Sequence, residues 1–263
     1  MVVQHNMQAA NTNRMLGKAA LSVSQSAEKL SSGYKVNRAA DDAAGLSISE
    51  KMRAQIRGLN QAVENAQDGI SLIQTAEGNM NEMHSILQRM ETLADKAAND
   101  VNASEDRETI ADEMKQLKSE LTAITSRSKY NGKALSNFSG YLQIGANKND
   151  NMAITVKVNV SVASTEVSSH TAASDTLSAV QAAIKEVSKQ RSALGAVQNR
   201  LNYTVNSVSN YAENLQAAES RIRDTDMATE MTAYTNANIV QQAAQSILAQ
   251  ANQSTQGVLS LLQ

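Results

Sequence analysis

The chain has 263 residues, a formal net charge of −2 from 24 basic and 26 acidic side chains, and no proline, cysteine or tryptophan. The lack of cysteine excludes disulfides, thiolate nucleophiles and the common zinc-finger patterns, and the scattered basic residues offer no face for nucleic acid. No run of about 20 apolar residues is present, so we expect no membrane insertion, and no secretory signal peptide is expected.

A first helix is predicted over residues 5–33. Its apolar positions form a broken face, and Gly33 stands where a helix would end. Residues 34–42 are predicted to be an irregular connector that ends in two acidic residues. Asp41 or Asp42 is expected to accept N–H groups at the start of the next helix. This capping role is favoured over a catalytic one because no partner acid lies nearby.

The longest amphipathic pattern runs from about residue 45 to 99. From Met52 to Ile73 its apolar residues alternate at spacings of four and three, which is typical of a helix packed along other helices. After a slip in the pattern the apolar face continues at Met83, Leu87 and Met90. At about 1.5 Å per residue this helix would be roughly 80 Å long, which favours a rod. A third helix, with a predicted N-cap at Ser104, repeats the pattern from Ile110 to Ile124 and should pair antiparallel to the long helix.

The periodicity then changes from that of a helix to that of a strand. Asn131-Gly132 is a turn signal, and every second residue from Met152 to Val162 is apolar, which predicts a strand with one buried face. Leu142 and Ile144 precede a polar turn at 147–150 and predict the partner strand of a hairpin. This is the one β region that the sequence predicts.

A fourth long helix is predicted from about Ser174 to a break at Asp224–Asp226, and a last helix follows to the end of the chain. The predicted fold class is therefore mainly α. It is a long antiparallel coiled-coil-like helical bundle with a small β-hairpin region at about 131–165, and its terminal helices pair into an inner coiled coil.

The two terminal helices carry apolar faces in a chain that lacks bulky core residues. Such faces are most economically buried against copies of the same chain, so we expect a self-assembling protein. The candidate polymerisation residues are Met7, Leu16, Ile239, Ile247, Leu248, Val258, Leu259, Leu261 and Leu262.

The sequence contains none of the familiar catalytic or metal-binding motifs. The three histidines, His5, His84 and His170, are far apart and have no helical partner at metal-ligand spacing. No glycine-rich phosphate loop or serine nucleophile motif is present. We therefore expect no enzyme activity, no metal and no cofactor.

Several long motifs occur in a fixed order near both ends of the chain. They are EKLSSG at 28–33, NRAADDAAGL at 37–46, NAQDGIS at 65–71 and AESRIRDTDMA at 218–228. These motifs resemble those of bacterial flagellins, over roughly residues 1–135 and 175–263. The short segment between these two regions is similar to that of a minimal flagellin without large outer domains.

The resemblance implies a secreted, extracellular structural subunit that polymerises into the bacterial flagellar filament for motility. Residues 1–40 and 225–263 would form the inner domain, and residues 41–224 the outer-tube domain. The implied partners are other copies of the chain, the flagellar export apparatus, a secretion chaperone, and the cap and hook-associated proteins.

The resemblance also implies recognition by the innate immune receptor Toll-like receptor 5. Arg89, Leu93 and Glu113 match the family's receptor-contact positions and are expected to lie on one exposed patch of the monomer. Many receptor-activating members have Arg-Glu where this chain has Glu91-Thr92. This replacement is expected to place an anion beside Arg89 and to make the chain a weak activator.

Three alternatives remain open at this point. A flagellar junction or hook-associated protein would share the amphipathic ends but should match less well along the long helices. A soluble helical signalling or receptor-binding module would explain the heptads but not the two apolar termini. An enzyme is supported by no group of residues.

Overall fold

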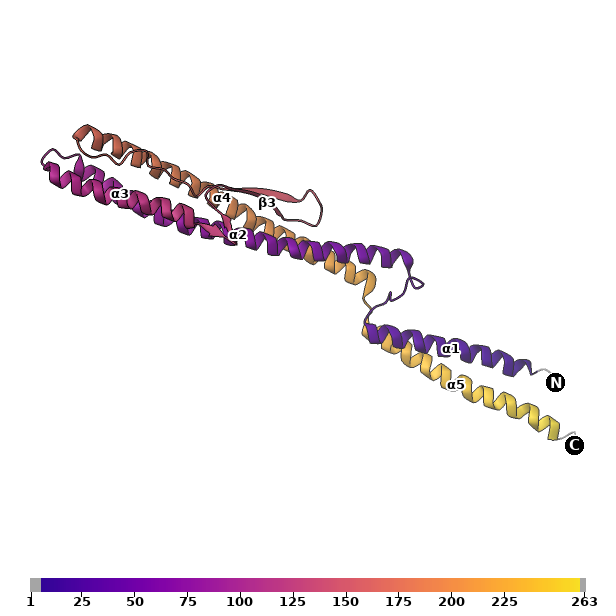
Figure 1. The fold of residues 1–263 in the computed structure, drawn as a ribbon. Coiled ribbons are helices and arrows are strands. Elements are labelled where there is room, and N and C mark those ends of the chain that lie inside the picture. The colour runs from indigo at the N-terminus through magenta and orange to yellow at the C-terminus, as the bar shows by residue number, and fades with distance from the viewer. Residues whose placement is uncertain (1–5, 261–263) are drawn as a thin grey trace. The chain divides into compact units, whose positions relative to one another are not determined.

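The computed structural model describes residues 6–260 and the side chains of residues 6–254. The chain divides into a terminal unit, Met1–Ala54 with Asn214–Gln263, and a central unit, Gln55–Glu213. Within the described residues, two short antiparallel strand pairs accompany five helices, which are α1 (Met7–Ser32), α2 (Ala43–Ala97), α3 (Ser104–Arg127), α4 (His170–Arg223) and α5 (Met227–Ser260) (Figure 1). The predicted fold class, a mainly α bundle with a small hairpin region, is confirmed.

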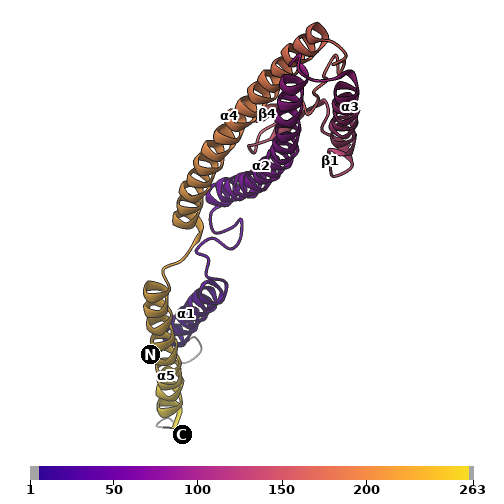
Figure 2. The same cartoon turned by 90° about the vertical axis from the view of Figure 1, so that its left-hand side faces the viewer.

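In the central unit α2 lies between α3 and α4 (Figure 2), and residues of all three helices share one core. The predicted heptad positions of α2 form the core of this unit. Met83, Leu87 and Met90 are fully buried there, together with Met114 of α3 and Val187 of α4. The heptad pattern therefore predicted which face of α2 would meet its neighbours.

The helix ends are determined by local capping contacts. Gly33 adopts φ 75° and ends α1, as its position predicted. The Asp42 carboxylate accepts the Gly45 N–H at 2.9 Å and caps α2. The prediction that Ser104 caps α3 is wrong by one residue, because Ala103 is the N-cap. Alanine has no side chain that could accept the first-turn N–H groups, and the one capping bond observed runs from the Ala103 N–H to the Asp106 carboxylate at 3.2 Å.

The predicted hairpin is formed by β3 (Phe138–Gln143) and β4 (Asn151–Val156), which pair antiparallel with Leu142 opposite Met152. Alternate burial continues to Val162, as predicted, although ladder pairing ends at Val156. The sequence reasoning missed a second pair, β1 (Lys129–Tyr130) with β2 (Lys133–Ala134). These two strands flank Asn131 and Gly132, which adopt φ 46° and 77°, as a tight two-residue hairpin turn requires.

The β3–β4 hairpin lies on one face of α2 that is marked by Gly58, Asn65 and Gly69. These positions are seven and four residues apart, so they share a side of the helix. The Asn65 amide donates to the Gln143 carbonyl at 3.0 Å. A Cβ at Gly58 would lie 2.9 Å from the Cβ of Ala146 at the hairpin tip and 3.2 Å from its Cα. The absence of a side chain at Gly58 therefore allows the tip to approach.

Two glycine-to-alanine substitutions in α2 are expected to differ in sign. Alanine is more favourable than glycine inside a helix by about 1 kcal/mol. Gly78→Ala should show this gain, because no atom lies within 4 Å of a Cβ there. Gly58→Ala should instead lower the free energy of unfolding, since the added Cβ would collide with Ala146. Urea unfolding of both variants measures the difference, and equal stabilisation by both would contradict this account of the hairpin seat.

In the terminal unit α1 and α5 run antiparallel and side by side (Figure 1 and Figure 2). Small side chains lie between them, since Ala19, Ala244 and Ala251 are buried. The Asn6 amide donates to the Ala251 carbonyl at 3.0 Å. The pairing of the two terminal helices is thus present within one chain, and it leaves their larger apolar side chains largely outside the contact.

Candidate assembly and receptor surfaces

The apolar residues of α1 and α5 that face away from the helix pair form a candidate assembly surface. Ile239 is 57% exposed and Ile247 is 55% exposed. Met7 is also exposed, and Leu16 and Leu248 are half-buried. The other candidates, Leu261 and Leu262 and the side chains of Val258 and Leu259, lie outside the described residues. Sequence reasoning left out further exposed members of this surface, namely Met15, Leu21, Met227, Met231 and Val240.

The exposed apolar side chains of α5 are not confined to one stripe. Ile239 and Val240 are consecutive, so they point about 100° apart around the helix, and both are more than half exposed. Ala244 and Ala251 are buried, and the Ala251 carbonyl accepts the Asn6 amide at the start of α1. The geometry of α5 therefore suits a helix with apolar neighbours on more than one side, of which a single chain provides one.

The predicted receptor residues lie where α3 packs on α2. The Arg89 guanidinium donates to Glu113 through Nη2 at 2.8 Å and Nε at 3.0 Å, and both side chains are largely exposed. The sequence prediction that these two residues share a face is confirmed. The prediction that Leu93 is exposed is wrong: Leu93 is 4% exposed and belongs to the core. It is buried because α3 covers the same side of α2, where Ile110 is also buried.

The position of Glu91 also differs from the sequence expectation. Residues two apart on a helix point about 160° apart, toward nearly opposite sides. Glu91 accepts a hydrogen bond from Gln181 of α4 at 3.1 Å, whereas Arg89 pairs with Glu113 of α3. The anion therefore faces α4 rather than Arg89.

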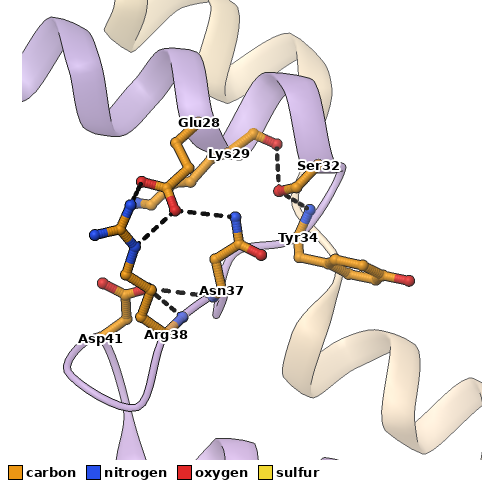
Figure 3. A network of polar contacts seen from close by, with 7 residues as sticks. All are labelled: Glu28, Lys29, Ser32, Tyr34, Asn37, Arg38 and Asp41. Atoms are coloured by element: carbon orange, nitrogen blue, oxygen red, sulfur yellow. Dashed lines mark hydrogen bonds and ion pairs between the residues drawn. The ribbon is translucent and has the colours of Figure 1, made fainter.

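A polar network holds the connector between α1 and α2 (Figure 3). Glu28 accepts from the Arg38 guanidinium at 2.9 and 3.0 Å and from the Asn37 amide at 3.3 Å. The Asp41 carboxylate accepts the backbone N–H groups of Arg38 at 2.9 Å and Asn37 at 3.2 Å, and these bonds lower its pKa below the usual 3.8. Asp41 thus folds the connector, while its neighbour Asp42 caps the helix.

Asp226 caps the start of α5, as Asp42 caps α2. Its carboxylate accepts the Thr229 hydroxyl at 2.9 Å and the backbone N–H groups of Thr229 and Ala228, and these bonds lower its pKa below 3.8. Because the folded pKa is depressed, the stabilisation is present above pH 3.8 and is lost as the pH falls through the folded value.

We therefore expect the first turn of α5 to fray in acid. Carbon NMR titration of the Asp226 carboxyl should give a pKa below 3.8, and amide exchange at Ala228 and Thr229 should accelerate below that value. Thr229→Val removes the hydroxyl donor and should move the pKa upward. An Asp226 titration that is unchanged in Thr229→Val would rule out the hydroxyl as its largest cause.

Within the described residues, no group of three or more His, Asp or Glu side chains could hold a metal ion. The same residues contain no helix that combines the length and apolarity needed to span a bilayer. His84 and His170 make separate contacts, with Gln88 and with the Ala98 carbonyl.

Two family models match the chain, one before and one after the segment 143–176. The bacterial flagellin N-terminal helical region matches residues 3–142, and the bacterial flagellin C-terminal helical region matches residues 177–262. The chain belongs to the bacterial flagellin family. The resemblance stated from the sequence motifs is thereby confirmed.

Known flagellins match this flagellin along its whole length. It is 48% identical over 271 residues to a flagellin of Halalkalibacterium halodurans and 44% identical over 285 residues to flagellin FlaB2 of Treponema pallidum, and each match covers all of both chains. The crystal structure of Bacillus cereus flagellin matches with a TM-score of 0.51 at 25% identity, over 59% of this chain and 94% of that one. The short form of the chain is consistent with these alignments.

Proposed function

We propose that this flagellin builds the flagellar filament by burying the exposed apolar side chains of α1 and α5 against other copies of itself. Flagellins are structural subunits of the filament, which lies outside the cell. The observation that carries the assembly mechanism is the exposure of Ile239, Val240 and Ile247 on more than one side of α5. Complete burial of each such side chain stabilises by about 1.5–3 kcal/mol.

Other partners follow from the family. We propose that the chain passes through the flagellar export apparatus with a secretion chaperone and assembles at a cap beyond hook-associated proteins. Full-length identity to flagellins supports a filament subunit over a hook-associated or junction protein. Residues 1–40 with 225–263 would form the inner domain of the filament, and 41–224 the outer tube.

Electron microscopy of the purified chain after seeding tests this function. Long filaments of uniform width are the expected product. Amide exchange should be slower across α1 and α5 in the filament than in the monomer, because subunit contacts cover their exposed faces. Persistence of the monomer after seeding would count against the filament role.

We further propose that the surface around Arg89 and Glu113 binds Toll-like receptor 5. The support is the family resemblance at these positions and their paired, exposed side chains. Arginine is enriched among the residues that dominate protein interfaces. Because Leu93 is buried, it supports this surface from beneath, and Arg89 is the better test of direct contact.

Arg89→Ala is expected to weaken receptor binding by about 10- to 100-fold, the range for a central interface arginine. Glu91→Arg should change binding less, since Glu91 faces α4 and Gln181. Surface plasmon resonance with the receptor ectodomain, together with a cell signalling assay, measures both. Unchanged binding by Arg89→Ala would remove this surface, and a large gain from Glu91→Arg would show that the anion weakens activation despite its direction.

A further inference from the structure

In the terminal unit, the backbone segment after α1 (residues 33–35) pairs with the segment before α5 (residues 223–225). We call these two paired segments the crossing. They form an antiparallel bridge at their middle residues, flanked by two hydrogen bonds. The Thr225 N–H donates to the Gly33 carbonyl at 3.0 Å, and the Lys35 N–H donates to the Arg223 carbonyl at 2.6 Å. The residue after α1 is therefore held directly against the residues before α5.

The side chain of Arg223 joins this crossing pair to the start of α2. Its guanidinium Nη1 donates to the Glu50 carboxylate at 2.8 Å, and its carbon Cζ lies 4.6 Å from the centre of the Tyr34 ring. The side chain is only 11% exposed, and its Nε is buried without a hydrogen-bond partner. A buried guanidinium between a carboxylate and an aromatic face makes both contacts stronger than at an exposed site.

A second contact joins the same helix ends. The hydroxyl of Ser49, which is fully buried, donates to the Glu219 carboxylate at 2.8 Å. Glu219 is one helical turn before Arg223 on α4. The start of α2 and the end of α4 are thus tied at two levels, and Arg223 also contacts the crossing through Tyr34. In Figure 3 the Tyr34 ring points away from the Glu28–Arg38 network. The contact of Tyr34 with Arg223 is therefore separate from that network.

We propose that Arg223 is a positioning residue for filament assembly, because its contacts with Tyr34 and Glu50 fix the axial register of α1 against α5. The two crossing hydrogen bonds determine which residue of α1 lies beside which residue of α5. A slip of this ladder would displace the exposed apolar side chains of α1 relative to those of α5. This inference rests on the proposed assembly function, but the state of the crossing is a property of the monomer.

The first test measures amide exchange in the monomeric full chain. Arg223→Gln removes the cation and is expected to accelerate exchange at Lys35 and Thr225 by about tenfold or more, as local opening of the crossing becomes easier. Tyr34→Leu should act similarly, whereas Tyr34→Phe keeps the ring and should not. Arg221→Gln is the matched control, because Arg221 lies two residues earlier on α4 and its side chain is exposed.

The second test compares seeded assembly. Arg223→Gln should slow filament growth although the Arg223 side chain is only 11% exposed and is not one of the exposed apolar residues. Arg223→Lys should restore part of the rate by restoring the charge. Unchanged exchange at Lys35 and Thr225 in Arg223→Gln would overturn the proposal, as would equal acceleration in the core of α2 around Leu87, which would indicate general destabilisation. Accelerated exchange with wild-type filament growth would also overturn it. Failure of the wild-type chain to assemble would instead count against the proposed function.

Discussion

Replacement of Ile239 and Ile247 with serine is expected to raise the critical concentration for filament assembly by about 10- to 100-fold. The two side chains are 57% and 55% exposed, so about half of each remains to be buried between subunits. At about 1.5–3 kcal/mol for complete burial, the pair loses about 1.5–3 kcal/mol of assembly free energy per subunit. Each 1.4 kcal/mol corresponds to a factor of ten in an equilibrium constant.

The monomer of this variant should keep its fold, because exposed substitutions change stability little. Sedimentation of seeded samples over a concentration series gives the critical concentration, and circular dichroism follows the helices. Gln242→Ser with Gln245→Ser on the same helix is the matched control, since it introduces the same residue at exposed polar positions. A control variant that assembles as poorly as the isoleucine variant would point to helix propensity rather than lost apolar burial.

Leu93→Ala is expected to destabilise the central unit by about 2–4 kcal/mol. A buried leucine loses both its transfer free energy and the packing around the cavity left behind, and Leu93 is 4% exposed within the α2–α3 core. Urea unfolding followed by circular dichroism measures the free energy of unfolding. Val101→Ala is the matched control, because Val101 is 88% exposed in the loop after α2 and should change stability by less than about 0.5 kcal/mol.

This result determines how receptor experiments on Leu93 are interpreted. If Leu93 were an exposed anchor, as the sequence suggested, its truncation would reduce receptor binding and leave stability unchanged. A buried Leu93 instead predicts a loss of stability, with any loss of binding following from a disturbed α2–α3 surface. An unfolding free energy equal to that of the parent chain would restore the sequence interpretation.

Much of the helical architecture could be predicted because its signals are local. A spacing of four and three needs only neighbouring residues to place Met83, Leu87 and Met90 on one face, and these residues are buried in the structure. The end of α1 at Gly33 and the turn at Asn131-Gly132 likewise follow from backbone conformations that glycine permits. The family resemblance came from long motifs, which are independent of packing.

The receptor surface could be predicted only in part, because exposure depends on which neighbour covers each side of α2. Sequence reasoning placed Arg89 and Glu113 together on an exposed patch, as observed. It could not show that α3 would also cover Leu93, one turn along, nor that Glu91 would face α4. A helix packed between two partners has two covered sides, and a single heptad stripe does not distinguish them.

Local sequence thus specified the helices, their apolar faces and the family, since each of these depends on residues close together in the chain. Contacts between distant segments came from tertiary packing. Two such contacts join residues far apart in sequence. One is the close approach of the hairpin tip to Gly58, and the other is the contact of Arg223 with Glu50 and Tyr34. Short-range periodicity does not encode these long-range contacts, because they depend on how the whole chain folds back on itself.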